Sequence, residues 1–139
     1  MGYGNLKSEC ANMSGDYAAP MGDFALTFLD SATVAHLMHL STKSYAQHVA
    51  LGGYYEAIPG LVDGVIEAYQ GRYDLVLRYT QSGGPDATSK SDPVKYLTGL
   101  QTYLDKQRKK LPPDANIQNE IDAVATLIDS TLYKLRFLS

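Results

Sequence analysis

Apolar residues recur every three or four positions in four separate segments of the chain, and this spacing limits its fold more than any other feature. Such a period is typical of a helix that buries one face. No segment alternates apolar and polar residues for long enough to build a sheet. At 139 residues the chain has the size of one domain with a hydrophobic core. We therefore predict an all-α protein folded as a four-helix bundle.

The first and last of these segments carry the clearest core stripes. We expect the first helix to begin near Met21 and to end near Ser41 or Thr42, and the last helix to follow Pro113 and to end near Phe137. The first stripe consists of Phe24, Phe28, Ala32, Ala35 and His39, widened by Leu29, Leu37 and Leu40, and the last consists of Ile117, Ile121, Val124, Leu127, Ile128, Leu132 and Leu135.

The second helix is marked by a capping residue and a proline. Ser44 is its expected N-cap, and the apolar pattern continues to about Thr80. Pro59 lacks a backbone donor and disfavours a helical conformation at the residue before it. We therefore expect a kink or a break at Pro59.

The third helix follows a long polar linker. Asp92 is its expected N-cap and Pro93 occupies its first position, and the basic run 106–110 suits its C-terminal end. The linker, residues 81–91, can extend roughly 35 Å, enough to cross much of a bundle lengthwise. A ferritin-like order with one long crossover and a simple up-down-up-down order both remain open.

Residues 1–20 differ in composition from the rest of the chain. They are rich in Gly, Ser, Asn and Ala, and Pro20 closes them. We expect an irregular N-terminal arm, flexible or bound to a protein partner, that precedes a bundle spanning residues 21–139.

Charge and cysteine content exclude several classes of function. The net charge is −3, so we expect no general attraction to nucleic acid or to anionic lipid. Cys10 is the only cysteine, so no disulfide can form within the chain. No apolar run is long enough to cross a membrane, and the N-terminal residues lack the apolar core of a signal peptide. We expect a cytoplasmic protein, or a virion protein if a phage encodes it.

Five side chains between positions 39 and 67 suggest a metal site. His39, His48, Asp63 and Glu67 combine imidazole with carboxylate, which suits iron or another divalent transition metal. Asp63 and Glu67 are four residues apart and share a helix face. Glu56 lies in the same sector of the helix and is a supporting candidate.

These ligands can meet only if chains associate or the helix folds back. On one straight helix His48 and Asp63 lie about 22 Å apart along the axis, too far for one ion. Two copies of the second helix packed antiparallel would bring His48 of one copy to Asp63 and Glu67 of the other, forming two equivalent sites. A fold-back at Pro59 is the alternative. We therefore predict a homo-oligomer that associates through the second helix.

This pattern resembles the Dps family of the ferritin-like superfamily. Proteins of that family carry a histidine near the end of the first helix, another early in the second, and an Asp and a Glu fifteen and nineteen residues after the second histidine. In this chain those positions hold His39, His48, Asp63 and Glu67. The family's further carboxylate, four residues after the second histidine, is Gly52 here, and Glu56 is the expected substitute. The chain is also similar to small ferritin-like proteins of bacteriophages.

Two functions follow from these observations. The resemblance implies an oligomeric Dps-like protein with an iron site between subunits that oxidises Fe(II). The alternative is a non-catalytic structural or assembly protein, such as a component of a phage particle, that keeps the bundle for self-association. Gly52 at a ligand position, the many tyrosines and the N-terminal arm favour this alternative.

Overall fold

The computed structural model describes the backbone of residues 3–80 and 92–139, and side chains from residue 17 onward within these ranges. Its helices are α1 (Tyr3–Ser41), α2 (Tyr45–Tyr73), α3 (Pro93–Gln107) and α4 (Ala115–Phe137), with a short 3-10 turn, η1 (Arg108–Lys110), after α3. The described ranges contain no strand. The prediction of an all-α protein with four helices is confirmed.

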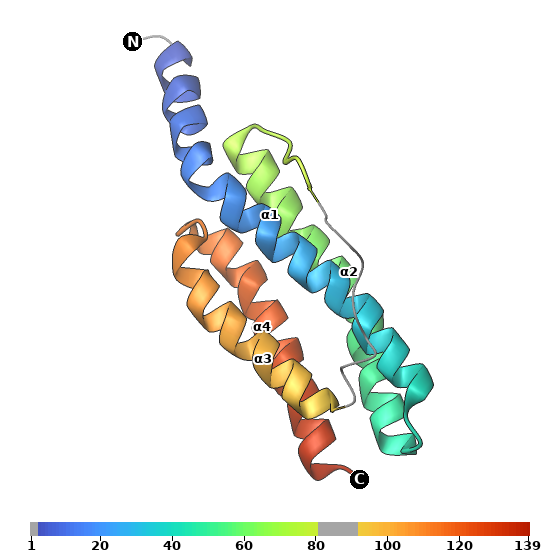
Figure 1. The fold of residues 1–139 in the computed structure, drawn as a ribbon. Helices are drawn as coiled ribbons and strands as arrows, with labels where there is room; N and C mark the ends of the chain where they lie inside the picture. The colour runs from blue at the N-terminus through green and yellow to red at the C-terminus, as the bar shows by residue number, and fades with distance from the viewer. Residues whose placement is uncertain (1–2, 81–91) are drawn as a thin grey trace.

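The helices form two antiparallel hairpins, α1 with α2 and α3 with α4 (Figure 1). The hairpins join mainly through α2 and α4, whereas α1 and α3 touch only slightly. Tyr73 at the end of α2 donates a hydrogen bond to Asp114, just before α4, so α2 and α3 both end where α4 begins. The two middle helices therefore run in the same direction, and α3 begins at the opposite end of the bundle from the end of α2. Of the two topologies that the sequence left open, the structure has the one with a long crossover.

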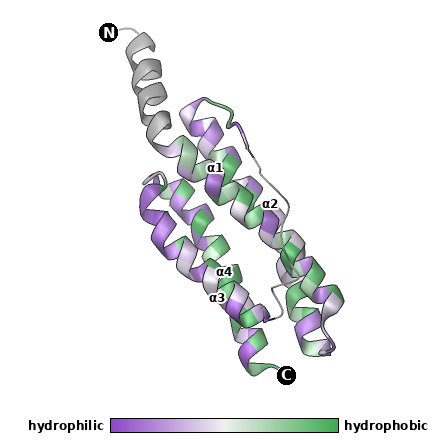
Figure 2. Cartoon of the chain, viewed as in Figure 1, coloured by the Kyte–Doolittle hydropathy of each residue, from purple (hydrophilic) through white to green (hydrophobic). Residues whose placement is uncertain are grey.

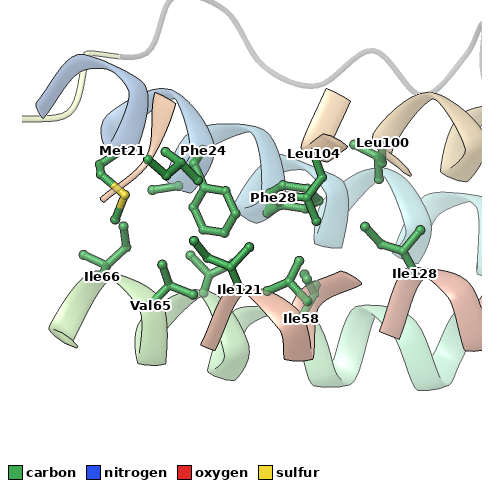
Figure 3. Packing of buried hydrophobic residues seen from close by; sticks show 14 of the residues in the cluster. Met21, Phe24, Phe28, Ile58, Val65, Ile66, Leu100, Leu104, Ile121 and Ile128 are labelled. Carbon is green, nitrogen blue, oxygen red and sulfur yellow. The ribbon is translucent and has the colours of Figure 1, made fainter. Parts of the chain in front are cut away.

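A continuous hydrophobic core runs between the hairpins (Figure 3). All four helices contribute to it, and the large side chains at its centre are fully buried. The predicted stripes of the first and last helices supply much of this core, as expected for amphipathic helices. Labelled core residues are Met21, Phe24, Phe28, Ile58, Val65, Ile66, Leu100, Leu104, Ile121 and Ile128.

The predicted helix starts are confirmed by their caps. The Ser44 hydroxyl accepts a hydrogen bond of 3.3 Å from the Gln47 amide. The Asp92 carboxylate accepts from the amides of Val94 and Lys95, and Pro93 occupies the first turn. Both caps satisfy amide groups that a helix start leaves without an intrahelical partner.

Helix α2 ends earlier than predicted and has no break at Pro59, where the alternative of a kink stays a prediction. It continues through Pro59 without a break, because Ile58 and Val62 on either side are buried in the same core. It ends at Tyr73 rather than near Thr80, because Asp74 takes a left-handed conformation with φ 56°. The backbone amide of Asp74 donates a hydrogen bond to the Gln70 carbonyl in the last turn, and this arrangement commonly ends a helix.

Helix α1 also differs, because it begins at Tyr3 and contains Pro20. The prediction of an irregular arm is therefore wrong for the backbone from Tyr3 onward. Tyr17 and Ala18 pack against the core, which holds the helix on the bundle on the N-terminal side of Pro20. The proposed partner of residues 1–20 stays a prediction.

Three leucines expected to widen the core stripe of the first helix point outward instead. Leu29, Leu37 and Leu40 are 40%, 41% and 66% exposed. The prediction fails because α1 packs mainly against α2 and touches α3 only slightly, so part of its surface has no neighbouring described helix. Figure 2 shows hydrophobic residues reaching the turn of this hairpin. No helix in the described residues has both the length and the hydropathy that a membrane span needs.

Candidate functional site

The two predicted histidine ligands meet beside the α1–α2 turn. The rings of His39 and His48 stack with their centres 3.6 Å apart and their planes 19° from parallel. His39 Nδ1 lies 2.6 Å from the His48 carbonyl oxygen, and His48 Nδ1 lies 2.9 Å from the His39 carbonyl oxygen. A carbonyl oxygen only accepts, so each Nδ1 must carry a proton and donate it. This histidine pair therefore clasps α1 to α2 by two reciprocal hydrogen bonds.

Gly52 makes room for the histidine pair. A Cβ atom at position 52 would lie 3.3 Å from Cε1 and 3.4 Å from Nδ1 of His39, closer than most side chains approach. The resemblance to Dps placed a metal-binding carboxylate here. The structure gives a different reason for the glycine, which is that the imidazole of His39 lies against the helix backbone.

Aromatic rings extend this cluster along the hairpin. His36 stacks on Tyr55 with ring centres 4.0 Å apart and planes 9° from parallel. Tyr55 also meets the edge of His39 at 5.1 Å. His36 itself is exposed, whereas the histidine pair is half-buried. The arrangement is a row of four rings that joins two helices, and sequence spacing alone did not indicate the part played by Tyr55.

The predicted carboxylate ligands do not join the histidines within one chain. Asp63, Glu67 and Glu56 are exposed on the outer face of α2. Because α2 is continuous, His48 and Asp63 are separated by about 22 Å along its axis, and the fold-back at Pro59 does not occur. Where side chains are described, no three of His, Cys, Asp and Glu come together as a metal-binding group. These residues therefore fit a single metal site only if a second copy supplies part of it.

The stacking of His39 and His48 limits how these two rings could bind a metal ion. With Nδ1 of each ring donating to a carbonyl, Nε2 is left as the nitrogen that could bind a metal, the usual arrangement for a histidine ligand. The lone pair of Nε2 lies in the ring plane, however, and the two planes are almost parallel. His39 and His48 cannot direct these lone pairs at one ion while they remain stacked.

A second polar cluster, which the sequence did not predict, ties the far end of α2 to α4. Asp114 accepts a hydrogen bond of 2.6 Å from the Tyr73 hydroxyl and pairs with Arg72 Nε at 2.5 Å. Partial burial acts to raise the pKa of Asp114, but the bonds from Tyr73 and Arg72 outweigh it and hold the pKa below its ordinary value. Burial and the neighbouring carboxylate raise the pKa of Tyr73. We call Arg72, Tyr73 and Asp114 the Asp114 cluster.

One buried polar contact lies within the core itself. The Ser31 hydroxyl donates to the Phe28 carbonyl at 2.6 Å, so the Tyr54 hydroxyl donates to Ser31 over 2.7 Å. Burial raises the pKa of Tyr54 well above its ordinary value. Both hydroxyls thus have partners, and the contact fixes how α1 and α2 meet rather than offering a reactive group.

The geometry defines the protein first as an all-α bundle with one long crossover and two interhelical clasps. The chain belongs to DUF5856, a family of unknown function, whose model matches residues 39–135. Comparison with curated proteins gave no match. Comparison with solved structures also gave none.

These findings correct the resemblance to Dps and to the ferritin-like superfamily. The matching family is DUF5856, and nothing found supports membership of the other two. The physical reason is that the spacing of His39, His48, Asp63 and Glu67 has another explanation. The histidines bind each other's backbone carbonyls, and the two carboxylates occupy the solvent-facing side of an amphipathic helix.

Proposed function

We propose that this protein is a non-catalytic structural or assembly protein that associates with further copies of itself. The supporting observation is that Leu29, Leu37 and Leu40 are exposed on one face of α1, because apolar residues gathered on one surface indicate a binding site. Exposed large apolar side chains are not confined to this face. They occur on both hairpins and on the segment after α2. These residues are Leu29, Leu37, Leu40, Tyr45, Val49, Val76, Tyr79, Tyr133, Phe137 and Leu138.

The packing of the protein interior is consistent with a structural role. Its largest fully buried side chains are packed in one core, and no buried side-chain polar atom of the described residues lacks a hydrogen-bond partner. The histidine pair and the Asp114 cluster fasten α2 to a neighbour near each of its ends. A bundle held in this way can present its outer faces in fixed positions, which an assembly requires.

An intersubunit metal site is the second candidate. It is favoured by the Nδ1 bonds of the histidine pair, which leave Nε2 of His48 as its possible metal-binding nitrogen. Asp63 and Glu67 of a second copy would supply oxygen ligands for iron or another divalent transition metal. This candidate requires α2 to pair with α2, and the exposed face of α2 carries Glu56 as well as these two acids. Pairing would gather like charges, which costs energy unless a cation lies between them.

Solution mass and metal binding together test both candidates. We expect multi-angle light scattering on the purified full chain to give a mass above one chain at tens of micromolar. That mass should not change when EDTA is added or when Glu67 is replaced by Ala. A monomer at all concentrations would contradict the proposal. Association that appears only with Fe(II), Mn(II) or Zn(II), and is lost in Glu67→Ala, would establish the second candidate instead.

A further inference from the structure

Three tyrosine rings meet where α2 ends, and one of them is hydrogen-bonded to a carboxylate. The ring centre of Tyr73 lies 5.0 Å from that of Tyr69 and 5.8 Å from that of Tyr17. The Tyr73 hydroxyl donates to Asp114 Oδ1 over 2.6 Å, whereas Arg72 binds the other carboxylate oxygen, Oδ2. Oδ1 is therefore the oxygen that can take a proton from the phenol.

The composition of the chain makes tyrosine its most readily oxidised kind of ring. The chain has eleven tyrosines and no tryptophan, and Cys10 is its one thiol. A phenol that loses an electron becomes a very strong acid, far stronger than any carboxylic acid. A tyrosine that already donates to a carboxylate is therefore easier to oxidise, because its proton can leave along the hydrogen bond as the electron departs.

Tyr54 and Tyr103 each have only part of this arrangement. Tyr54 is fully buried, but it donates to the Ser31 hydroxyl, which is a much weaker base than a carboxylate. Tyr103 does donate to a carboxylate, that of Asp23, but the bond is longer at 2.9 Å and the residue is only half-buried. Tyr73 combines a carboxylate acceptor with an exposure of 6%.

Burial separates Tyr73 from oxidants in solution, and its neighbour Tyr17 supplies the route to it. Tyr69 and Tyr73 are both buried, whereas Tyr17 is only half-buried. Electrons pass between rings that are this close without any movement of the chain. Burial and the bond to Asp114 raise the pKa of Tyr73, so the phenol keeps its proton until an electron is taken from it.

We propose that one-electron oxidation of this chain comes to rest on Tyr73, with Tyr17 as the entry point and Asp114 as the proton acceptor. A small radical oxidant, such as a peroxyl radical, takes one electron through Tyr17 and becomes its anion. The O–H bond of Tyr73 breaks, the proton passes to Asp114 Oδ1, and a neutral phenoxyl radical remains on the buried ring. This inference goes beyond the proposed function and does not depend on it, because it needs only one copy of the chain.

Pulse radiolysis with the azide radical tests the site. Azide radicals oxidise tyrosine to the phenoxyl radical, whose visible absorption can be followed, and Cys10→Ser serves as the parent chain so that no thiol competes. We expect part of the signal to be long-lived and to decay at a rate independent of protein concentration, because a buried radical does not couple with another molecule. Decay that depends wholly on protein concentration would overturn the proposal.

Two tyrosines that donate to carboxylates provide matched variants. Tyr73→Phe should reduce the long-lived fraction by about tenfold or more, and Tyr103→Phe should reduce it by less than about twofold. Asp114→Asn keeps an acceptor oxygen but takes up no proton, so it should also reduce the fraction by about tenfold or more. Circular dichroism should show that each variant keeps the helical content of the parent.

The remaining outcomes decide each part of the proposal. A long-lived signal that survives Tyr73→Phe, or is lost equally in Tyr103→Phe, would overturn Tyr73 as the resting place. An unchanged signal in Asp114→Asn would overturn Asp114 as the proton acceptor. Tyr17→Phe should slow the growth of the long-lived signal, and an unchanged growth rate would overturn the entry point. Tyr17→Phe and Asp114→Asn keep the test decisive if Tyr73→Phe does not fold.

Discussion

The two ends of α2 are fastened to their neighbours by opposite kinds of chemistry. Near the turn, the histidine pair joins α2 to α1 through rings that donate to backbone carbonyls. At the other end, the Asp114 cluster joins α2 to α4 through a carboxylate that accepts from a phenol and a guanidinium. The first clasp depends on close packing and the second on charge. Substitutions and pH should therefore affect the two ends differently.

The largest expected effect is at the charged end. Asp114→Ala would leave the buried Tyr73 hydroxyl without its acceptor, and we expect the free energy of unfolding to fall by about 2 kcal/mol. Urea denaturation followed by circular dichroism measures it. Asp114→Asn keeps an acceptor oxygen and should lose less. Equal losses in the two variants would show that the charge, not the hydrogen bond, carries the contact.

At the other end, His48→Ala removes the ring stack and the hydrogen bond from His48 Nδ1 to the His39 carbonyl oxygen. It keeps the backbone carbonyl of position 48 that accepts from His39 Nδ1. We expect a loss of about 1 kcal/mol of unfolding free energy, close to one net hydrogen bond. His36→Ala is the matched control, because His36 is exposed and contacts the rings of Tyr55 and His39. It should cost less than about 0.5 kcal/mol. If His36→Ala costs as much, the hydrogen bond that His48 Nδ1 donates contributes nothing beyond ring packing.

Neighbouring glycines separate packing from helix propensity. Gly53 has open space where a Cβ would lie, so Gly53→Ala should stabilise the chain by up to about 1 kcal/mol. Gly52→Ala should gain clearly less, because its methyl group meets the His39 ring. In a His39→Ala background the two substitutions should become equivalent, as a double-mutant cycle would reveal. A persistent difference there would mean that something other than His39 restricts position 52.

The smallest effect expected is on acid stability. The pKa of Asp114 is lowered in the folded chain, so its contribution is present above the ordinary Asp pKa of about 3.9 and is lost as the pH falls through the folded value. Unfolding free energies measured between pH 7 and pH 3 should therefore fall more for the parent chain than for Asp114→Asn. Parallel pH profiles for the two proteins would contradict this assignment.

Local signals predicted the helices well but their continuity poorly. Ser44, Asp92 and Pro93 marked helix starts correctly because capping depends on adjacent residues. Pro59 and Pro20 misled because packing of their neighbours against the core outweighs the local cost of a proline. Leu29, Leu37 and Leu40 fit a buried stripe by period, yet periodicity does not reveal how many neighbours a helix has.

The candidate site was predicted only in part. Spacing indicated His39 and His48 as metal ligands, which stays a prediction, and it could not show that their Nδ1 atoms bind each other's backbone carbonyls. That arrangement depends on the absence of a side chain at Gly52, which lets the His39 ring lie against the backbone of α2. The Asp114 cluster joins positions 41 and 42 residues apart, and no local pattern reports such a contact.

The order of the helices has a consequence for how the chain folds. Three residues separate α1 from α2, so that hairpin closes a short loop at little entropic cost. Arg72 and Asp114, in contrast, meet across 42 residues. Contacts so far apart in sequence form late and slowly compared with local ones. We expect each hairpin to collapse early, and the docking of one on the other to be the slow step.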